Sequence, residues 1–352
     1  MRACRVSLLR TQSADVVTSN VINLRASSGA VARLAICLIV FVGATPAVAQ
    51  VPVPVDGDLI SSAPRSPLPP FAQLDEFGRG YFPREVYEEA RAQQRFDVRS
   101  IQYQSGGHAV GGVMVQPRDS GNRRWPVIIY NRGGTGDFGR LDDLNIVDFY
   151  LWAKAGFVVV ASDYRFRGER SRRDEWGGAD VDDVLNLVPF VRALPFVDPD
   201  RLFMIGVSRG GTMAYLALKR GIPVKAAAII AGPSDLEAFG RARPEFVDGD
   251  ADYDGWAKVW PDYARNAATL YRDRSAVRWA DRIDVPVLIL HSRRDRMVPV
   301  SQALEMAAAL QAAGKVYALH IYDNDGHSLP LNRDDRNRQI VDWFNREAQR
   351  PR

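Results

Sequence analysis

Short apolar runs alternate with longer mixed stretches over most of the chain. After Trp125 the mostly apolar runs are 127–130, 157–160, 202–205, 224–230, 287–290 and 316–322. Such runs are typical of parallel strands that helices cover on both faces. The stretches between them predict helices, roughly at 141–155, 179–194, 209–221, 300–313 and 333–348. This alternation predicts an α/β fold with a mostly parallel, doubly wound sheet, whose functional residues gather at the carboxyl ends of the strands.

The segment before Trp125 follows another period. Residues 96–103 alternate apolar and polar side chains, Ser105-Gly106-Gly107 is a turn signal, and an apolar stretch returns at 110–115. This pattern predicts an antiparallel N-terminal hairpin with one face toward solvent. A short helix is expected before it, around 84–94.

One long segment, 234–282, interrupts the alternation between two predicted core strands. Its aromatic residues are Phe239, Phe246, Tyr253, Trp256, Trp260, Tyr263, Tyr271 and Trp279. Connections of this length are more often functional than not. We therefore interpret 234–282 as a cap insertion over the site, with Trp256 and Trp260 as candidate substrate-binding residues. The alternative is that these rings pack into a small core of the insertion itself.

The first fifty residues have the pattern of an export signal. Arg33 precedes the apolar run 34–42, and a helix-breaking glycine and proline then lead to Ala47-Val48-Ala49. This arrangement predicts a signal peptide over 1–49, cleaved near Ala49, and an exported protein, either periplasmic or secreted. The apolar run is about half of the roughly 20 residues that span a bilayer, so a retained anchor is the weaker alternative. A start at Val31 would give a more compact signal.

Composition narrows the classes of partner. Of 46 Lys and Arg residues five lie in 1–49, and of 42 Asp and Glu residues one does, so the remaining chain carries 41 of each. That balance gives no indication of a nucleic-acid or anionic-lipid partner. Both cysteines, Cys4 and Cys37, lie within the predicted signal, so no disulfide is expected in the mature chain.

Proline and serine are concentrated in residues 51–70. We interpret 50–80 as an extended, proline-rich leader, followed by a catalytic domain over 81–350. No repeat of 20–50 residues is visible in the sequence, which argues against a solenoid or a propeller.

A candidate nucleophile lies at the end of a predicted strand. Gly206-Val207-Ser208-Arg209-Gly210-Gly211 follows the run 202–205 and opens a predicted helix. G-x-S-x-G in this setting is typical of a nucleophile elbow, a sharp turn that exposes the serine hydroxyl. The helix N-terminus adds partial positive charge for a developing oxyanion. The sequence therefore predicts a serine hydrolase with Ser208 as its nucleophile.

A serine hydroxyl needs a base to take its proton. The chain has four histidines. His108 lies in the predicted hairpin, and His291 and His320 lie within or at the end of predicted strands. His327 follows the last predicted strand in a loop at the carboxyl edge, and we predict that it is the base.

The base in turn needs a carboxylate that fixes its orientation. Asp295 lies just beyond the predicted strand 287–290. The order Ser208, Asp295, His327 along the chain is that of the α/β-hydrolases. Asp235, just after the preceding strand, is the alternative acid.

Two backbone amides are expected to bind the oxyanion. One is that of Arg209, directly after the nucleophile, and the other that of Gly133, in the loop after the first parallel strand. Arg132 in the same loop is a candidate to bind a substrate carboxylate, since a guanidinium group binds carboxylates in a bidentate manner. An ordinary surface ion pair is the alternative for Arg132.

No cofactor and no metal site are predicted. The sequence has no H-E-x-x-H motif, no cysteine cluster and too few histidines for a zinc site. No G-x-G-x-x-G motif follows the first parallel strand in a dinucleotide-binding context.

Three motifs together resemble the catalytic domain of the prolyl oligopeptidase family of serine peptidases. Residues 206–211 are similar to its G-x-S-x-G-G motif, His291 to Pro299 to its acid motif, and Asp325-Gly326-His327 to its histidine loop. The likeness covers roughly 125–348. It implies an α/β-hydrolase fold and carries Ser208, Asp295 and His327 over as a catalytic triad.

The chain departs from this family at three points. The segment between Ala49 and Trp125 is too short for the β-propeller that usually precedes the domain. Arg132-Gly133-Gly134-Thr135 replaces H-G-G-P, and Val207 replaces the aromatic residue that often precedes the serine. We expect a serine-type peptidase acting on a small peptide, with a carboxylesterase or acyl hydrolase acting on an ester as the alternative. A non-catalytic binding protein on this fold is the rival outside the enzymes, and the oligomeric state stays open.

Overall fold

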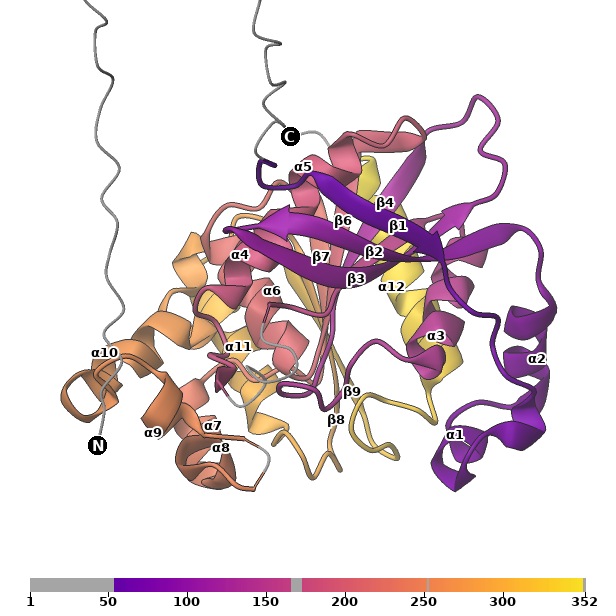
Figure 1. The fold of residues 1–352 in the computed structure, drawn as a ribbon. Coiled ribbons are helices and arrows are strands. Elements are labelled where there is room, and N and C mark those ends of the chain that lie inside the picture. The colour runs from indigo at the N-terminus through magenta and orange to yellow at the C-terminus, as the bar shows by residue number, and fades with distance from the viewer. Residues whose placement is uncertain (1–53, 166–172, 252, 351–352) are drawn as a thin grey trace, which may run out of the picture. The chain divides into compact units, whose positions relative to one another are not determined.

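A sheet of nine strands forms the centre of the protein (Figure 1). The computed structural model describes residues 54–165, 173–251 and 253–350. The signal peptide predicted over 1–49 lies outside these residues. The strands are β1 (Leu59–Pro64), β2 (Phe96–Ser105), β3 (His108–Pro117), β4 (Trp125–Asn131), β5 (Val158–Ser162), β6 (Val197–Val207), β7 (Ala226–Ile230), β8 (Val287–Ser292) and β9 (Tyr317–Tyr322). The helices are η1 (Phe71–Gln73), α1 (Glu76–Tyr81), α2 (Arg84–Ala92), α3 (Asp143–Lys154), α4 (Asp180–Leu185), α5 (Leu187–Arg192), α6 (Arg209–Lys219), α7 (Leu236–Ala242), α8 (Glu245–Asp248), α9 (Trp256–Val259), α10 (Tyr263–Arg274), η3 (Ala276–Arg278), η4 (Ala280–Arg282), α11 (Ser301–Ala312) and α12 (Arg333–Ala348).

The order of the strands is β1-β2-β3-β5-β4-β6-β7-β8-β9. Antiparallel pairing joins β1 to β2, β2 to β3 and β3 to β5. From β5 onward every neighbouring pair in this order is parallel. The structure therefore confirms both the mostly parallel sheet and the N-terminal hairpin, whose strands meet where Ser105 pairs with His108.

The central parallel strands are buried because their apolar runs face helices on both sides. Every residue of β4, β5, β7 and β8 is buried. Helices α3 and α12 pack against each other on one face of the sheet, and α4, α5 and α6 pack on the other (Figure 1). On the first face, Phe344 of α12 stacks on Phe203 of β6 with ring centroids 4.7 Å apart. This packing leaves the strand ends as the places for polar chemistry.

Part of the segment expected to be an extended leader belongs to the sheet. Within 50–80, the mostly exposed β1 pairs with β2 at the edge. Pro64 ends β1, and proline is tolerated at such a place because an edge strand has backbone groups that need no partner in the sheet. Farther along, Asp75 caps α1 by accepting a hydrogen bond from the Gly78 amide at 2.7 Å. The proline-rich composition is thus compatible with ordered structure.

The long insertion at 234–282 forms the short helices α7 to α10 and the turns η3 and η4. Figure 1 shows α7 and α8 at the same end of the sheet as α1. Side chains from α7 and from α1 line one cavity, which also contains Ser208. The insertion therefore contributes to the wall of the candidate site.

Candidate active site

Ser208 occupies a sharp turn between β6 and α6. Its backbone has φ 54° and ψ −127°, in the left-handed region that side chains rarely adopt. Its amide donates a hydrogen bond to the Ile230 carbonyl at 2.8 Å, and its carbonyl accepts one from the Gly211 amide at 2.7 Å. This strained turn is the geometry expected of a nucleophile elbow.

Gly210 is needed because the elbow lies directly against the strand β4. A Cβ atom at this position would lie 2.0 Å from the Asn131 carbonyl oxygen. We expect Gly210→Ala to displace the elbow, to lower the free energy of unfolding by about 1–3 kcal/mol and to reduce turnover. Denaturant unfolding and a hydrolysis assay measure the two effects. Gly80→Ala is the matched control, since nothing lies within 4 Å of its Cβ position. Equal behaviour of the two variants would contradict this account of the elbow.

His327 and Asp295 form a hydrogen-bonded pair at the same edge of the sheet. The distance from Nδ1 of His327 to Oδ2 of Asp295 is 2.8 Å. The other carboxylate oxygen of Asp295 accepts hydrogen bonds from the amides of Met297 at 2.8 Å and Val298 at 2.9 Å. These amides fix the carboxylate, and the carboxylate in turn orients the imidazole ring.

The protonation of Asp295 is set by two opposing effects. Burial alone raises the pKa of its carboxyl group. Hydrogen bonds from His291, His327 and the Val298 amide favour the charged form and outweigh burial, so the pKa of Asp295 lies well below its usual range. Asp295 is therefore an anion at every pH at which a histidine acts as a base.

Asp325, two residues before His327, holds the loop that carries this histidine. The side chain of Asp325 accepts hydrogen bonds from the amides of Gly326 at 2.8 Å and Asn332 at 2.8 Å. The Ser292 hydroxyl at the end of β8 donates to the Asp325 carbonyl. The histidine loop is thereby joined to the strand after which Asp295 lies.

Asp235, the alternative acid, has a different place in the structure. It caps α7 by accepting a hydrogen bond from the Ala238 amide at 3.0 Å. Its carboxylate also lies 3.5 Å from the guanidinium of Arg278. The acid that the structure places at His327 is Asp295.

Ser208 and His327 share a cavity of about 390 Å³. Gly133 lines it as well, and a Cβ atom at Gly133 would lie only 3.1 Å from Cβ of Ser208. Apolar walls surround these three residues. The apolar side chains that line the cavity include Phe77, Tyr81, Tyr130, Phe138, Leu144, Trp176, Phe239, Phe246, Met297 and Val298. The arrangement suits a carbonyl substrate with a bulky apolar group.

The structure corrects the expectation for Arg132. Its side chain is only 1% exposed and does not line the cavity. The guanidinium donates to the carbonyl oxygens of Gly133, Gly136, Phe138 and Asp163 at 2.7–3.3 Å. The guanidinium group of Arg132 therefore stabilises its own loop. Its N–H groups already bond to backbone carbonyls, so they are not available for a bidentate contact with a substrate carboxylate.

Trp256 and Trp260 are also placed away from the cavity. They are 0% and 2% exposed, and their rings stack nearly parallel with centroids 4.9 Å apart. Both belong to an apolar cluster formed by Trp176, Leu236, Phe239, Tyr253, Trp256, Trp260, Tyr271 and Val298. Trp256 and Trp260 therefore follow the alternative stated in the sequence analysis, in which the rings pack into a small core of the insertion. Among the aromatic residues of the insertion 234–282, Phe239 and Phe246 line the cavity.

Trp256→Ala should therefore act on stability. We expect the free energy of unfolding to fall by about 3–5 kcal/mol, because a fully buried indole is removed and a cavity remains. Phe138→Ala is the control, since that ring is 79% exposed, and its effect on stability should stay within about 0.5 kcal/mol. Denaturant unfolding measures both. A stable Trp256→Ala protein with a raised KM would restore the substrate-binding role.

Several cavity residues had no signal in the sequence. Phe77 lies on α1, inside the segment interpreted as a leader, and Tyr81 is the last residue of the same helix, just after that segment. Trp176 lies between two predicted elements. Only long-range packing brings them to Ser208. A single sequence carries no local pattern that reports such packing.

Residues 54–165, 173–251 and 253–350 contain neither a membrane-spanning helix nor a cluster of metal-ligating side chains. None of the helices in these ranges combines the length and the apolar character that crossing a bilayer requires. No group of three or more His, Cys, Asp or Glu side chains there is arranged to hold a metal ion.

The sheet order, the elbow and the Asp–His pair after β8 and β9 define the protein as an α/β-hydrolase. A profile described as the prolyl oligopeptidase family matches residues 144–350. The chain belongs to this family. The resemblance inferred from the three sequence motifs is thus confirmed.

Several relatives in sequence are named as peptidases. The chain is 28% identical over 270 residues to "Uncharacterized peptidase YuxL" of Bacillus subtilis, covering 69% of this chain and 38% of that protein. It is 25% identical over 253 residues to "Uncharacterized peptidase YtmA" of the same organism, covering 71% of this chain and 94% of YtmA. Dipeptidyl-peptidase 5 of Porphyromonas gingivalis is 25% identical over 268 residues, covering 71% and 37%. The chain therefore spans less than half of YuxL and of that dipeptidyl-peptidase, and nearly all of YtmA.

Solved structures show the same fold. Acylaminoacyl peptidase of Pyrococcus horikoshii superposes with a TM-score of 0.60 at 23% identity, covering 74% of this chain and 43% of the other. A puromycin-hydrolysing peptidase of Mycobacterium tuberculosis gives a TM-score of 0.61 at 22% identity, covering 73% and 40%. The predicted α/β-hydrolase fold is confirmed.

Proposed function

We propose that this protein hydrolyses peptide bonds as a serine peptidase of the prolyl oligopeptidase type. The observation that carries the proposal is the 2.8 Å hydrogen bond between His327 and Asp295 beside the cavity that Ser208 and His327 share. Membership of the prolyl oligopeptidase family supports the proposal, as do the relatives YuxL and YtmA, both of which are named as peptidases.

In the proposed reaction, Oγ of Ser208 attacks the carbonyl carbon while its proton passes to Nε2 of His327. The Nδ1–H group of His327 donates to Asp295, so Nε2 is the nitrogen free to accept that proton. The C–N bond then breaks, and the proton moves from Nε2 to the leaving nitrogen. Ser208 is left acylated. A water molecule then attacks the acyl carbon while its proton passes to Nε2 of His327. The bond between the acyl carbon and Oγ breaks, and His327 returns the proton to Oγ of Ser208.

The negative oxygen of the tetrahedral intermediate needs hydrogen-bond donors. The amide of Arg209 at the start of α6 and the amide of Gly133 are the proposed donors. The close approach of Gly133 to Ser208 supports this assignment. The N-terminal end of α6 adds partial positive charge at the same place.

The proposed substrate is a small peptide with an apolar side chain near the scissile bond. Aromatic rings from the insertion and from α1 line the cavity. Burying a large apolar side chain there contributes about 1.5–3 kcal/mol to binding. Such a cavity also accepts esters, which keeps the acyl-hydrolase alternative in view.

An assay of two substrate types on one preparation tests the proposal. Aminoacyl and prolyl anilides report amide hydrolysis, and short p-nitrophenyl esters report ester hydrolysis. We expect both to be cleaved, with Ser208→Ala preparations inactive on each. Turnover of esters alone would make the protein an acyl hydrolase. Turnover of neither, together with tight binding of a peptide, would make it a binding protein.

We also propose that the chain is exported and that cleavage occurs near Ala49. The basic residue, apolar run and Ala47-Val48-Ala49 ending in the sequence support this step. N-terminal sequencing of the protein recovered outside the cytoplasm tests it, with Gln50 as the expected first residue. Full-length protein retained with the cells would contradict it.

A further inference from the structure

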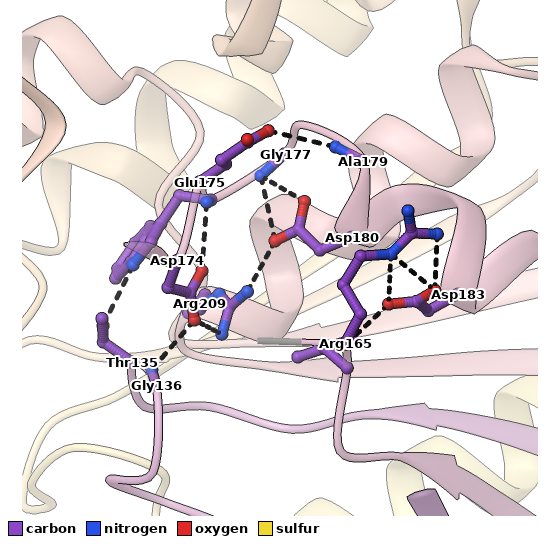
Figure 2. A network of polar contacts seen from close by, with 12 residues as sticks. Thr135, Gly136, Arg165, Asp174, Glu175, Gly177, Ala179, Asp180, Asp183 and Arg209 are labelled. Carbon is purple, nitrogen blue, oxygen red and sulfur yellow. Dashed lines mark hydrogen bonds and ion pairs between the residues drawn. The ribbon is translucent and has the colours of Figure 1, made fainter. Parts of the chain in front are cut away.

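A buried network of charged side chains includes the residue that follows the nucleophile in the chain (Figure 2). Its centre is the side chain of Arg209, which follows Ser208 and is 0% exposed. Nη1 of Arg209 lies 2.5 Å from Oδ2 of Asp174, and Nη2 lies 2.7 Å from Oδ2 of Asp180. Both acids are buried as well. The backbone amide of Arg209 is a proposed oxyanion donor, and its guanidinium group is a buried cation held by two acids.

The same network reaches the glycine loop, by which we mean residues 131–139. Asp174 accepts a hydrogen bond from the Gly136 amide at 2.9 Å. Nη1 of Arg209 donates to the Gly134 carbonyl at 3.2 Å. The Trp176 indole donates to the Thr135 hydroxyl at 3.0 Å. Three consecutive residues of the loop, Gly134 to Gly136, are therefore fastened to the segment 174–176 or to Arg209 (Figure 2).

The glycine loop needs such external support. Gly134 and Gly136 have positive φ angles, +74° and +56°. Glycine adopts positive and negative φ about equally readily, so these residues do not fix the backbone of the loop by themselves. Yet an oxyanion hole works only if its donors stand about 2.7–3.1 Å from the developing negative oxygen. The proposed donors, Gly133 and Arg209, come from two separate segments. Something must hold these segments at a constant separation.

A contribution to the folding stability of the protein is not enough to explain why these charged residues are buried here. A buried ion pair loses much of its Coulomb energy to the desolvation of both charges, and apolar replacements are often equally stable. Here the pair joins the two segments that provide the oxyanion donors. Arg132 supports the same loop from within by its bonds to the carbonyls of Gly133 and Gly136.

We propose that Arg209 and Asp174 are positioning residues, whose ion pair holds the Gly133 amide and the Arg209 amide at the separation that an oxyanion requires. This inference rests on the proposed function, since it assigns a role within that reaction. It places no side chain of the network on the substrate. Its effect is on the transition state, and substrate binding in the ground state should change little.

The test compares an ester with its thionoester analogue on the wild type and on Asp174→Ala. A sulfur atom in place of the carbonyl oxygen is larger and accepts hydrogen bonds weakly, so the oxyanion donors stabilise it less. We expect Asp174→Ala to lower kcat for the ester by about 10- to 100-fold with KM nearly unchanged. The thionoester rate should fall much less, so the ester-to-thionoester ratio should drop by about 10-fold. Rates are normalised to active sites counted by burst titration.

The matched control is the neighbouring buried pair Arg165–Asp183, with Nη2 and Oδ1 2.8 Å apart (Figure 2). Asp183→Asn disturbs a comparable ion pair, which joins the segment just after β5 to α4 and whose two side chains also bond to Ser105. It should leave the ester-to-thionoester ratio at the wild-type value. Arg209→Lys, which keeps the charge but loses the planar fork, should give an intermediate ratio.

The outcomes separate this inference from the proposed function. A wild type that cleaves neither esters nor amides refutes the proposed function. A wild type that is active, with an unchanged ratio in Asp174→Ala or an equal drop in Asp183→Asn, refutes the positioning role alone. If Asp174→Ala yields no titratable sites, Asp174→Asn decides in its place, since it keeps an acceptor for the Gly136 amide and removes only the charge.

Discussion

Ser208→Ala will lower turnover by about 10⁶-fold. The reason is that no other group can form the covalent bond to the acyl carbon, and a water molecule attacking directly gains only from the oxyanion donors. Alanine keeps the Cβ atom that the elbow already accommodates at φ 54°. The free energy of unfolding should therefore stay close to that of the wild type. Steady-state hydrolysis and denaturant unfolding measure the two quantities.

Two results would count against this assignment of Ser208. The first is a folded variant with activity within tenfold of the wild type, because the nucleophile would then lie elsewhere. The second is a variant that does not fold, because the hydroxyl would then have a structural role. Material from a Gly80→Ala preparation, changed at an open position on α1, serves as the activity control.

Asp295→Asn will lower kcat by about 10⁴-fold, the size of effect expected when the orienting acid of a Ser-His-Asp triad loses its charge. The asparagine amide donates to Nδ1 of His327, which places the proton of the neutral ring on Nε2. That nitrogen then has no lone pair to accept the proton of Ser208. The cavity and the elbow remain in place, so KM should change little. Steady-state kinetics on purified protein give both parameters.

Asp235→Asn is the matched control, because Asp235 is also a buried acid at the end of a parallel strand and is the other candidate from the sequence. Asparagine caps a helix about as well as aspartate, so α7 keeps its cap and the free energy of unfolding should stay within about 0.5 kcal/mol of the wild type. Its kcat should stay within a few-fold of the wild type. If the two variants exchange these effects, the acid of the triad is Asp235.

The charge of Asp295 also predicts how stability depends on pH. Its pKa in the folded protein lies below the unfolded value of about 3.9. The stability that its hydrogen bonds contribute is therefore fully present above about pH 4 and is lost as the pH falls through the folded pKa. The difference in unfolding free energy between wild type and Asp295→Asn should shrink as the pH falls from about 4 toward the folded pKa of Asp295. A difference that grows on acidification would contradict the lowered pKa.

Local chemistry was sufficient to predict the elbow. Ser208 follows a buried apolar strand and precedes a helix, and the flanking glycines are required by close contacts such as that of Gly210 with Asn131. The mostly parallel character of the sheet could be predicted because continuous apolar runs indicate parallel strands. The position of Asp295 and His327 after consecutive strands then brought them to one edge of the sheet.

Long-range packing decided what the sequence could not show. Arg132 was a reasonable carboxylate ligand until its guanidinium proved to be enclosed by four backbone carbonyls of distant and local residues. The partners of Arg209, Asp174 and Asp180, are about thirty residues away in the chain. Phe77 reaches the cavity from a segment whose composition indicates a tether. No periodic pattern or motif in the sequence marks any of these contacts.

The most direct test of the whole account is covalent labelling of the wild type with a fluorophosphonate probe, followed by mass spectrometry of the digested protein. A serine whose proton is taken by a braced imidazole reacts with such a probe, whereas an ordinary serine does not. The account predicts one phosphonylated peptide, modified at Ser208, with labelling lost in Ser208→Ala and strongly slowed in Asp295→Asn. An unlabelled wild type, or an adduct on a different serine, would contradict it.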